Sequence, residues 1–187
     1  MGSAAVEDRA VAGRLLDALQ EPGCPACRIA RRSATRHIRS LLWESVTDVD
    51  TRQRLRAAHG FCRTHAIAAV SVAADAGQAS GLAILADDFI RHVSADARAA
   101  AGSRRKNRDV RPDDACPVCE ASTVAVGTAV ALLAGAPEDT ELGKAARGAG
   151  RFLCLPHLRR GLRQTETRLQ AELLVELFAP VADDIRE

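Results

Sequence analysis

The chain has 187 residues, of which 47% are hydrophobic and only 3% aromatic, and its formal net charge at pH 7 is +2. That length can bury the core of one domain or of two small ones. The near-neutral charge excludes attraction to nucleic acid by a global electrostatic field, so nucleic-acid binding would need a local basic face.

The sequence also argues against membrane insertion and secretion. No apolar run reaches the roughly 18 residues that cross a bilayer, and the N-terminus carries acidic residues where a signal peptide would be apolar. We therefore expect a soluble, cytoplasmic protein. In that reducing compartment, six cysteines with two C-x2-H pairings of cysteine and histidine among them indicate metal binding and not disulfides.

Apolar spacing and turn residues predict an all-α fold, because no strong period-2 alternation of β-branched and aromatic residues is present. In the first part of the chain, the expected helices span residues 4–20, 28–43, 50–59, 63–76 and 80–101. The first of them ends at the Glu-Pro-Gly of residues 21–23. We expect very little sheet.

The segment 102–115 is charged, contains Gly and Pro, and is predicted to link two halves, residues 1–101 and 116–187. Beyond it, the helix expected at 120–135 is apolar on every face, which predicts burial between other helices or in an oligomer interface. A short helix runs to about Gly150. A long amphipathic helix closes the chain, with its apolar stripe at Leu169, Leu173, Leu177 and Val181.

Two cysteine motifs occur twice, each time with the same displacement of 92 residues. The motif C-P-x-C gives Cys24 and Cys27, and it recurs as Cys116 and Cys119. The motif C-x2-H gives Cys62 with His65, and it recurs as Cys154 with His157. The repeated pattern C-P-x-C-x34-C-x2-H predicts two pseudo-repeated halves, and burial of free cysteines gives no reason for that spacing.

Each half supplies three cysteines and one histidine, which is a closed tetrahedral ligand set typical of structural zinc. We expect one site from Cys24, Cys27, Cys62 and His65 and another from Cys116, Cys119, Cys154 and His157. Two zinc ions per chain follow. Two iron-sulfur clusters are the alternative, because three thiolates and an imidazole also bind iron.

Residues 41–65 carry a further pattern. Between the first C-P-x-C and the G-F-C-x2-H at Gly60–His65 lies E-x-V-x-D-x3-R, formed by Glu44, Val46, Asp48 and Arg52. The three motifs together resemble an uncharacterised prokaryotic family whose function is unknown. The resemblance implies a helical fold and metal binding but no reaction. Asp48 is expected to cap the helix near Asp50, Glu44 and Arg52 form a candidate ion pair, and ligand binding by the triad is the alternative.

We assign no catalytic or cofactor-binding site among the remaining residues. His37 is expected to be solvated and His59 to lie at a helix C-terminus.

The favoured function is a non-enzymatic, metal-stabilised interaction or regulatory module with a protein partner or a second copy. The alternatives are an iron-sulfur redox protein and an enzyme with a pocket between the halves. Arginines of 28–39 and 104–108 keep nucleic acid as a weaker alternative partner.

Overall fold

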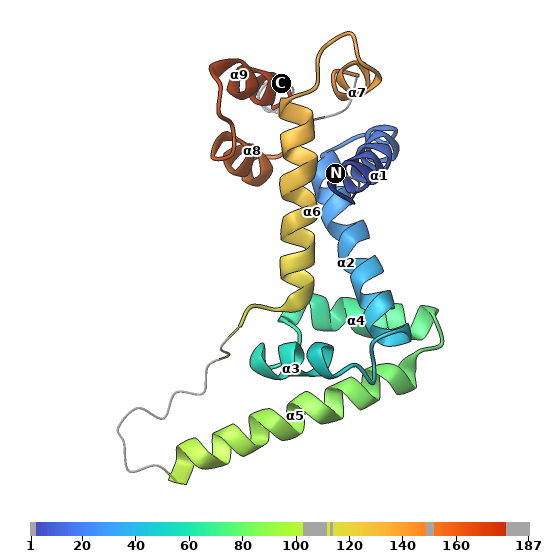
Figure 1. The fold of residues 1–187 in the computed structure, drawn as a ribbon, viewed down its shortest axis with the longest axis vertical. Coiled ribbons are helices and arrows are strands. Elements are labelled where there is room, and N and C mark those ends of the chain that lie inside the picture. The colour runs from blue at the N-terminus through green and yellow to red at the C-terminus, as the bar shows by residue number, and fades with distance from the viewer. Residues whose placement is uncertain (1–2, 103–111, 113, 149–151, 179–187) are drawn as a thin grey trace, which may run out of the picture. The chain divides into compact units, whose positions relative to one another are not determined.

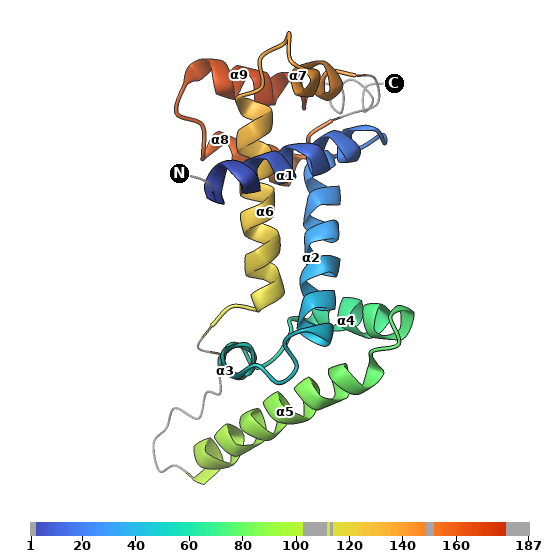
Figure 2. The ribbon, with the colours of Figure 1, turned by 45° about the vertical axis from the view of Figure 1, so that its right-hand side comes forward.

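A computed structural model of the chain describes residues 3–102, 112, 114–148 and 152–178. All regular structure within these ranges is helical, which confirms the predicted fold class. The helices are α1 (Ser3–Leu19), α2 (Pro25–Trp43), α3 (Val49–Ala57), α4 (Arg63–Asp75), α5 (Ala79–Gly102), α6 (Pro117–Ala134), α7 (Glu141–Ala146), α8 (Leu155–Leu162) and α9 (Arg168–Glu176). Figures 1 and 2 show their order along the chain.

Most predicted helices are present, with two differences. Helix α2 begins at Pro25, three residues earlier than expected, since proline is well suited to the first helical position. The long C-terminal helix is instead two helices, because α8 ends at Leu162 and Thr167 begins α9 with a capping box to Gln170. Val181 and most of the 102–115 linker lie outside the described residues.

The chain divides into two compact units that differ from the two sequence repeats. One unit, called here the terminal unit, comprises Met1–Arg32 and Ser122–Glu187, and the other, the central unit, comprises Ser33–Ala121. The unit boundaries therefore fall inside α2 and α6 and not in the predicted linker. Each repeat contributes residues to both units.

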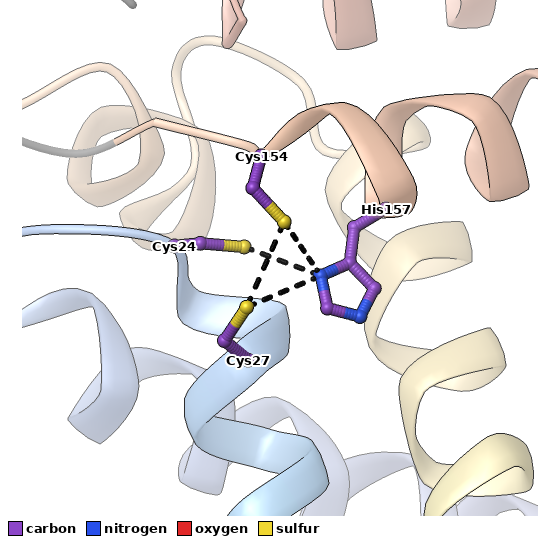
Figure 3. A group of neighbouring side chains, drawn as sticks. All are labelled: Cys24, Cys27, Cys154 and His157. Carbon is purple, nitrogen blue, oxygen red and sulfur yellow. Dashed lines mark hydrogen bonds between the residues drawn. The ribbon is translucent and has the colours of Figure 1, made fainter.

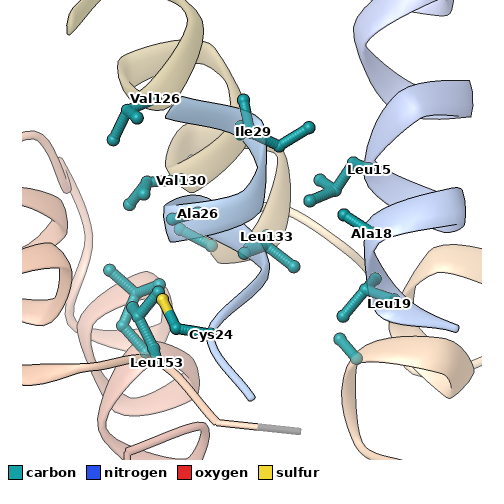
Figure 4. Packing of buried hydrophobic residues seen from close by; sticks show 14 of the residues in the cluster. Leu15, Ala18, Leu19, Cys24, Ala26, Ile29, Val126, Val130, Leu133 and Leu153 are labelled. Carbon is teal, nitrogen blue, oxygen red and sulfur yellow. The ribbon is translucent and has the colours of Figure 1, made fainter. Parts of the chain in front are cut away.

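The core of the terminal unit joins the start of the chain to its second half. Leu15 and Leu19 of α1, Ile29 of α2 and Val130 and Leu133 of α6 are almost fully buried in one cluster, shown in part in Figure 4. Leu153, Leu158 and Leu174 extend this cluster toward α8 and α9. Burial of each such side chain contributes roughly 1.5–3 kcal/mol, so this packing holds the two chain segments together.

The central unit has its own core. Ile38 and Leu42 of α2, Leu55 of α3, Val72 of α4 and Leu85 of α5 form its buried cluster. Val118, near the start of α6, is fully buried in the same cluster. Because Val118 follows Cys116 and precedes Cys119, the core fixes the second C-P-x-C motif within this unit.

Helix α6 contradicts the expectation that no apolar segment of the chain is long enough to span a membrane. It has 18 residues, and its length and composition would allow a membrane crossing. The same property is found in core helices of soluble proteins, and 39% of the α6 span is buried within the protein. Val126, Ala129, Val130 and Leu133 belong to the core of the terminal unit, so a structural role explains much of its apolar character.

Candidate metal centres

The structure gathers the eight predicted ligands into two groups of four. The terminal centre consists of Cys24, Cys27, Cys154 and His157, and Figure 3 shows their side chains converging. The central centre consists of Cys62, His65, Cys116 and Cys119. Within each group, the ligand atoms all lie within 4.8 Å of one another. Both groups therefore have the Cys3His composition that the sequence predicts.

The expected grouping within each repeat is wrong. The C-P-x-C pair Cys24 and Cys27 does not meet Cys62 and His65 but meets Cys154 and His157 of the other repeat, and the second C-P-x-C pair is exchanged in the same way. The two copies of each motif are chemically equivalent, so spacing alone does not decide which copies meet. Core packing decides it, because α1, α2, α6 and α8 share one hydrophobic cluster.

Each motif stands at the start of a helix. Cys62 and Cys154 are the N-cap residues of α4 and α8, with extended backbone, and their sulfurs make no capping hydrogen bond. Cys24 and Cys116 immediately precede Pro25 and Pro117, the first residues of α2 and α6. In every case the second ligand follows three residues later, on the first helical turn. Side chains at these two positions approach one another, as they do in a capping box, so each motif presents two ligands together.

In the terminal centre, His157 faces the sulfurs with its Nδ1 atom (Figure 3). This nitrogen lies 3.5 Å from the Cys24 sulfur, 3.5 Å from that of Cys27 and 3.0 Å from that of Cys154. The sulfurs of Cys27 and Cys154 are 3.6 Å apart. Cys24 is buried and Cys27 is exposed, so the centre lies at the edge of the core.

The central centre repeats this geometry. The Nδ1 atom of His65 lies 3.3 Å from the sulfurs of Cys62 and Cys119 and 3.6 Å from that of Cys116. The sulfurs of Cys62 and Cys119 are 3.6 Å apart.

These separations fit a single tetrahedral ion. Metal bonds of about 2.3 Å to sulfur and about 2.1 Å to nitrogen place two sulfurs about 3.8 Å apart and a sulfur and a nitrogen about 3.6 Å apart. Of the distances given above, all but one lie within about 0.3 Å of these values, and the separation of 3.0 Å between Cys154 and His157 is about 0.6 Å shorter. The chemistry and spacing of the donors are therefore compatible with one ion in each centre.

The thiols of the terminal centre differ in acidity. Burial opposes ionisation of Cys24, but hydrogen bonding from His157 and from the backbone of Cys154 and Cys27 outweighs it and lowers the pKa of Cys24 to about 6. Burial and the charge of Cys24 raise the pKa of Cys27 to about 12. The thiolate of Cys24 thus opposes ionisation of the Cys27 thiol. A divalent cation bound in the centre would offset this repulsion between the two sulfurs.

The central centre behaves similarly. Burial and a hydrogen bond to Cys62 raise the pKa of Cys119 to about 12. The pKa of Cys62 is lowered, because contacts to the backbone of His65 and to Cys119 overcome the effect of burial. Burial also lowers the pKa of His65, which favours the neutral imidazole that a metal ligand requires.

A tight helix end positions the first ligand of the central centre. Helix α3 ends in a Schellman motif, in which the N–H of Gly60 donates to Leu55 at 2.7 Å and that of His59 donates to Arg56 at 3.0 Å. His59 and Gly60 both have positive φ, at 51° and 89°. A β-carbon on Gly60 would lie 2.6 Å from the ring of Phe89. This turn delivers Cys62 to the centre, and it confirms that His59 lies at a helix C-terminus.

The charged residues of the E-x-V-x-D-x3-R motif form a helix cap, an ion pair and a hydrogen bond within the central unit. Asp48 caps α3 as predicted, accepting a hydrogen bond of 2.7 Å from the Thr51 N–H. Arg52 pairs with Asp88 of α5 and not with Glu44, which accepts a hydrogen bond from Ser40 at 3.0 Å. Sequence reasoning did not identify Asp88, because nothing in the local pattern indicates that α5 packs against α3.

The expectation of a solvated His37 is wrong. The residue is half-buried, and its Nε2 atom is buried with no hydrogen-bond partner among the described residues. Burial, with a smaller effect of the Arg54 charge, lowers the pKa of His37. It lies outside both candidate centres.

Fold and sites together define an all-helical protein with two Cys3His groups compatible with metal binding. The chain belongs to a family of unknown function, DUF6062, whose family model matches residues 14–187. This agrees with the resemblance to an uncharacterised family. No curated protein matches the chain, and no solved structure matches it.

Proposed function

We propose that the protein is a non-enzymatic interaction or regulatory module whose two helical units are each stabilised by one structural zinc ion. The observation that supports this most is the separation of the ligand atoms, which suits a tetrahedron around a single ion in both centres. Three thiolates and one imidazole form a closed set. Because no position is left for water or substrate, the ions would stabilise the fold and not catalyse hydrolysis.

The ligand spacing favours zinc over an iron-sulfur cluster. In a cluster of several irons, the protein ligands are distributed over different irons and stand further apart than ligands around one ion. All four ligand atoms of each centre lie within 4.8 Å of one another. A reducing cytoplasm, which would keep the six cysteines available as thiolates, is the location that this proposal favours.

The crossed grouping supports a structural role for the ions. The ligands Cys27 and Cys154 are 127 residues apart in the chain, and Cys62 and Cys119 are 57 residues apart. An ion bound in each centre would restrict the unfolded chain much as a disulfide does, and this restriction grows with the length of the closed loop. Helical units with few aromatic residues gain most from such a cross-link.

Metal content tests the proposal directly. Protein purified without added metal and without oxygen should contain two zinc ions per chain by elemental analysis, and it should be colourless. Iron with acid-labile sulfide and a brown colour would instead support the redox protein. Protein that keeps its fold without any metal would overturn both readings.

A further inference from the structure

A cavity lies in the central unit, and its lining contains none of the cysteine or histidine ligands. It has a volume of about 340 Å³ and lies between the C-terminal ends of α2 and α4. Its lining consists of Arg36, Arg39, Ser40, Leu42, Trp43, Glu44, Val72, Ala76 and Gln78. Ala76 follows His65 by eleven residues, which places the cavity roughly 16 Å along α4 from the central centre. The volume suits a small ligand.

The cavity presents an apolar surface to solvent. Leu42 and Val72 belong to the buried core and provide apolar lining. Beside them, Trp43 is the single tryptophan of the chain, and 72% of its surface is exposed. So large an apolar side chain is normally well buried, and exposed tryptophans are enriched where proteins bind other molecules.

The charged side chains of the cavity indicate the kind of ligand. Arg28 and Arg32 pair with Glu21, and Arg52 and Arg56 pair with Asp88. In contrast, the described part of the chain gives no ion pair to either Arg36 or Arg39. Glu44 is the one acidic residue in the lining, and it already accepts the Ser40 hydroxyl. Two positive charges and one negative charge leave the lining with a net charge of +1.

We propose that this cavity binds a small amphipathic carboxylate. The apolar body of the ligand would pack against Leu42, Val72 and the Trp43 ring, and its carboxylate would be bound by Arg36 and Arg39. Guanidinium groups suit this role, because they bind carboxylates with two parallel hydrogen bonds and remain charged at all relevant pH values. The site is additional to the proposed structural zinc and does not depend on the identity of the metal.

Trp43 allows a direct test. The full-length, metal-loaded protein is titrated with 4-phenylbutyrate and with octanoate, and its tryptophan fluorescence is recorded, with isothermal titration calorimetry as a second measurement. Both carboxylates should produce a saturable signal. The matched neutral amides, 4-phenylbutanamide and octanamide, should bind at least ten-fold more weakly, because they cannot pair with the arginines.

Variants then locate the site. Arg36→Gln with Arg39→Gln should weaken carboxylate binding at least ten-fold, whereas Arg31→Gln, an exposed arginine of the same helix outside the lining, should not change it. Circular dichroism and metal content must match those of the unaltered protein. Failure of both carboxylates to bind by calorimetry, equal binding of acids and amides, or an equal effect of the control variant would each overturn the proposal while leaving the zinc proposal intact.

Discussion

The sulfur atoms of Cys27 and Cys154 lie 3.6 Å apart although 127 residues separate them in the sequence. This contact joins the first repeat to the second at the terminal centre. Residues 33–121, which form a compact unit with its own centre, are inserted between the two segments of the terminal unit. Neither repeat therefore contains a complete metal centre, and neither should fold as an independent metal-binding half.

Metal removal should destabilise the whole chain. A cross-link that closes a loop of about 100 residues contributes roughly 4–5 kcal/mol by the chain-entropy account. For a protein of this size, loss of that contribution should lower the melting temperature by about 10 °C or more. Circular dichroism before and after chelation measures the change. Equal melting curves for the loaded and metal-free protein would show that the centres do not support the fold.

Replacement of Asp88 by Asn should weaken the packing of α5 against α3. Only 10% of the Asp88 side chain is exposed, and it accepts hydrogen bonds from Arg52 and Arg56 at 2.5–2.8 Å. Loss of these charge-assisted bonds should reduce the free energy of unfolding by about 2 kcal/mol in urea denaturation. The neighbouring Asp87 pairs with Arg91 but is 61% exposed, so Asp87→Asn should cost less than about 0.5 kcal/mol. Similar losses in both variants would contradict a special role for Asp88.

The contribution of Asp88 should depend on pH. Hydrogen bonds from Arg56 and Arg52 hold the pKa of its carboxyl far below the usual value. A depressed folded-state pKa stabilises the protein above the unfolded pKa of about 3.9 and loses this effect as the pH falls below it. The stability difference between the unaltered protein and Asp88→Asn should therefore be constant near neutrality and shrink below about pH 4. A difference that grows on acidification would refute the assignment.

Gly161 should be required for the position of α8. A β-carbon there would lie 2.6 Å from both Leu174 Cδ1 and Val130 Cγ1, two fully buried side chains. Gly161→Ala should therefore cost about 1–3 kcal/mol by overpacking and should weaken metal binding by Cys154 and His157 on the same helix. At Gly13 of α1 a β-carbon meets nothing within 4 Å, so Gly13→Ala should be neutral or stabilising by up to about 1 kcal/mol. Chemical denaturation and metal competition of both variants provide the comparison.

Metal binding should release protons at neutral pH. In the absence of a cation, the pKa values of Cys27 and Cys119 are raised to about 12, so both thiols carry protons at pH 7. Binding as thiolates must displace at least one proton at each centre, and affinity should therefore increase with pH. Calorimetry in buffers with different ionisation enthalpies counts the protons. Uptake of protons, or an affinity that falls as the pH rises from 6 to 8, would contradict this thiolate ligation.

The metal ligands and one helix cap could be predicted, because each is determined by a short stretch of sequence. The eight ligands stand out by their repeated spacing, and Asp48 could be identified as a cap from its position before α3. The break between α8 and α9 has a local signal in the capping-box residues Thr167 and Gln170, which the prediction of one long amphipathic helix overlooked. The pairing of Cys27 with Cys154, like that of Arg52 with Asp88, depends on which distant helices pack together. Equivalent motif copies give no local signal for that choice.

Thiol labelling of Cys154→Ser tests the crossed centres most directly. The variant is loaded with zinc, treated with iodoacetamide under native conditions and analysed by peptide mass spectrometry. We predict about one zinc per chain, with Cys24 and Cys27 labelled because their centre has lost a ligand, and with Cys62, Cys116 and Cys119 still protected. Labelling of Cys116 and Cys119 with protection of Cys24 and Cys27 would show instead that each repeat forms its own centre, and it would contradict the account.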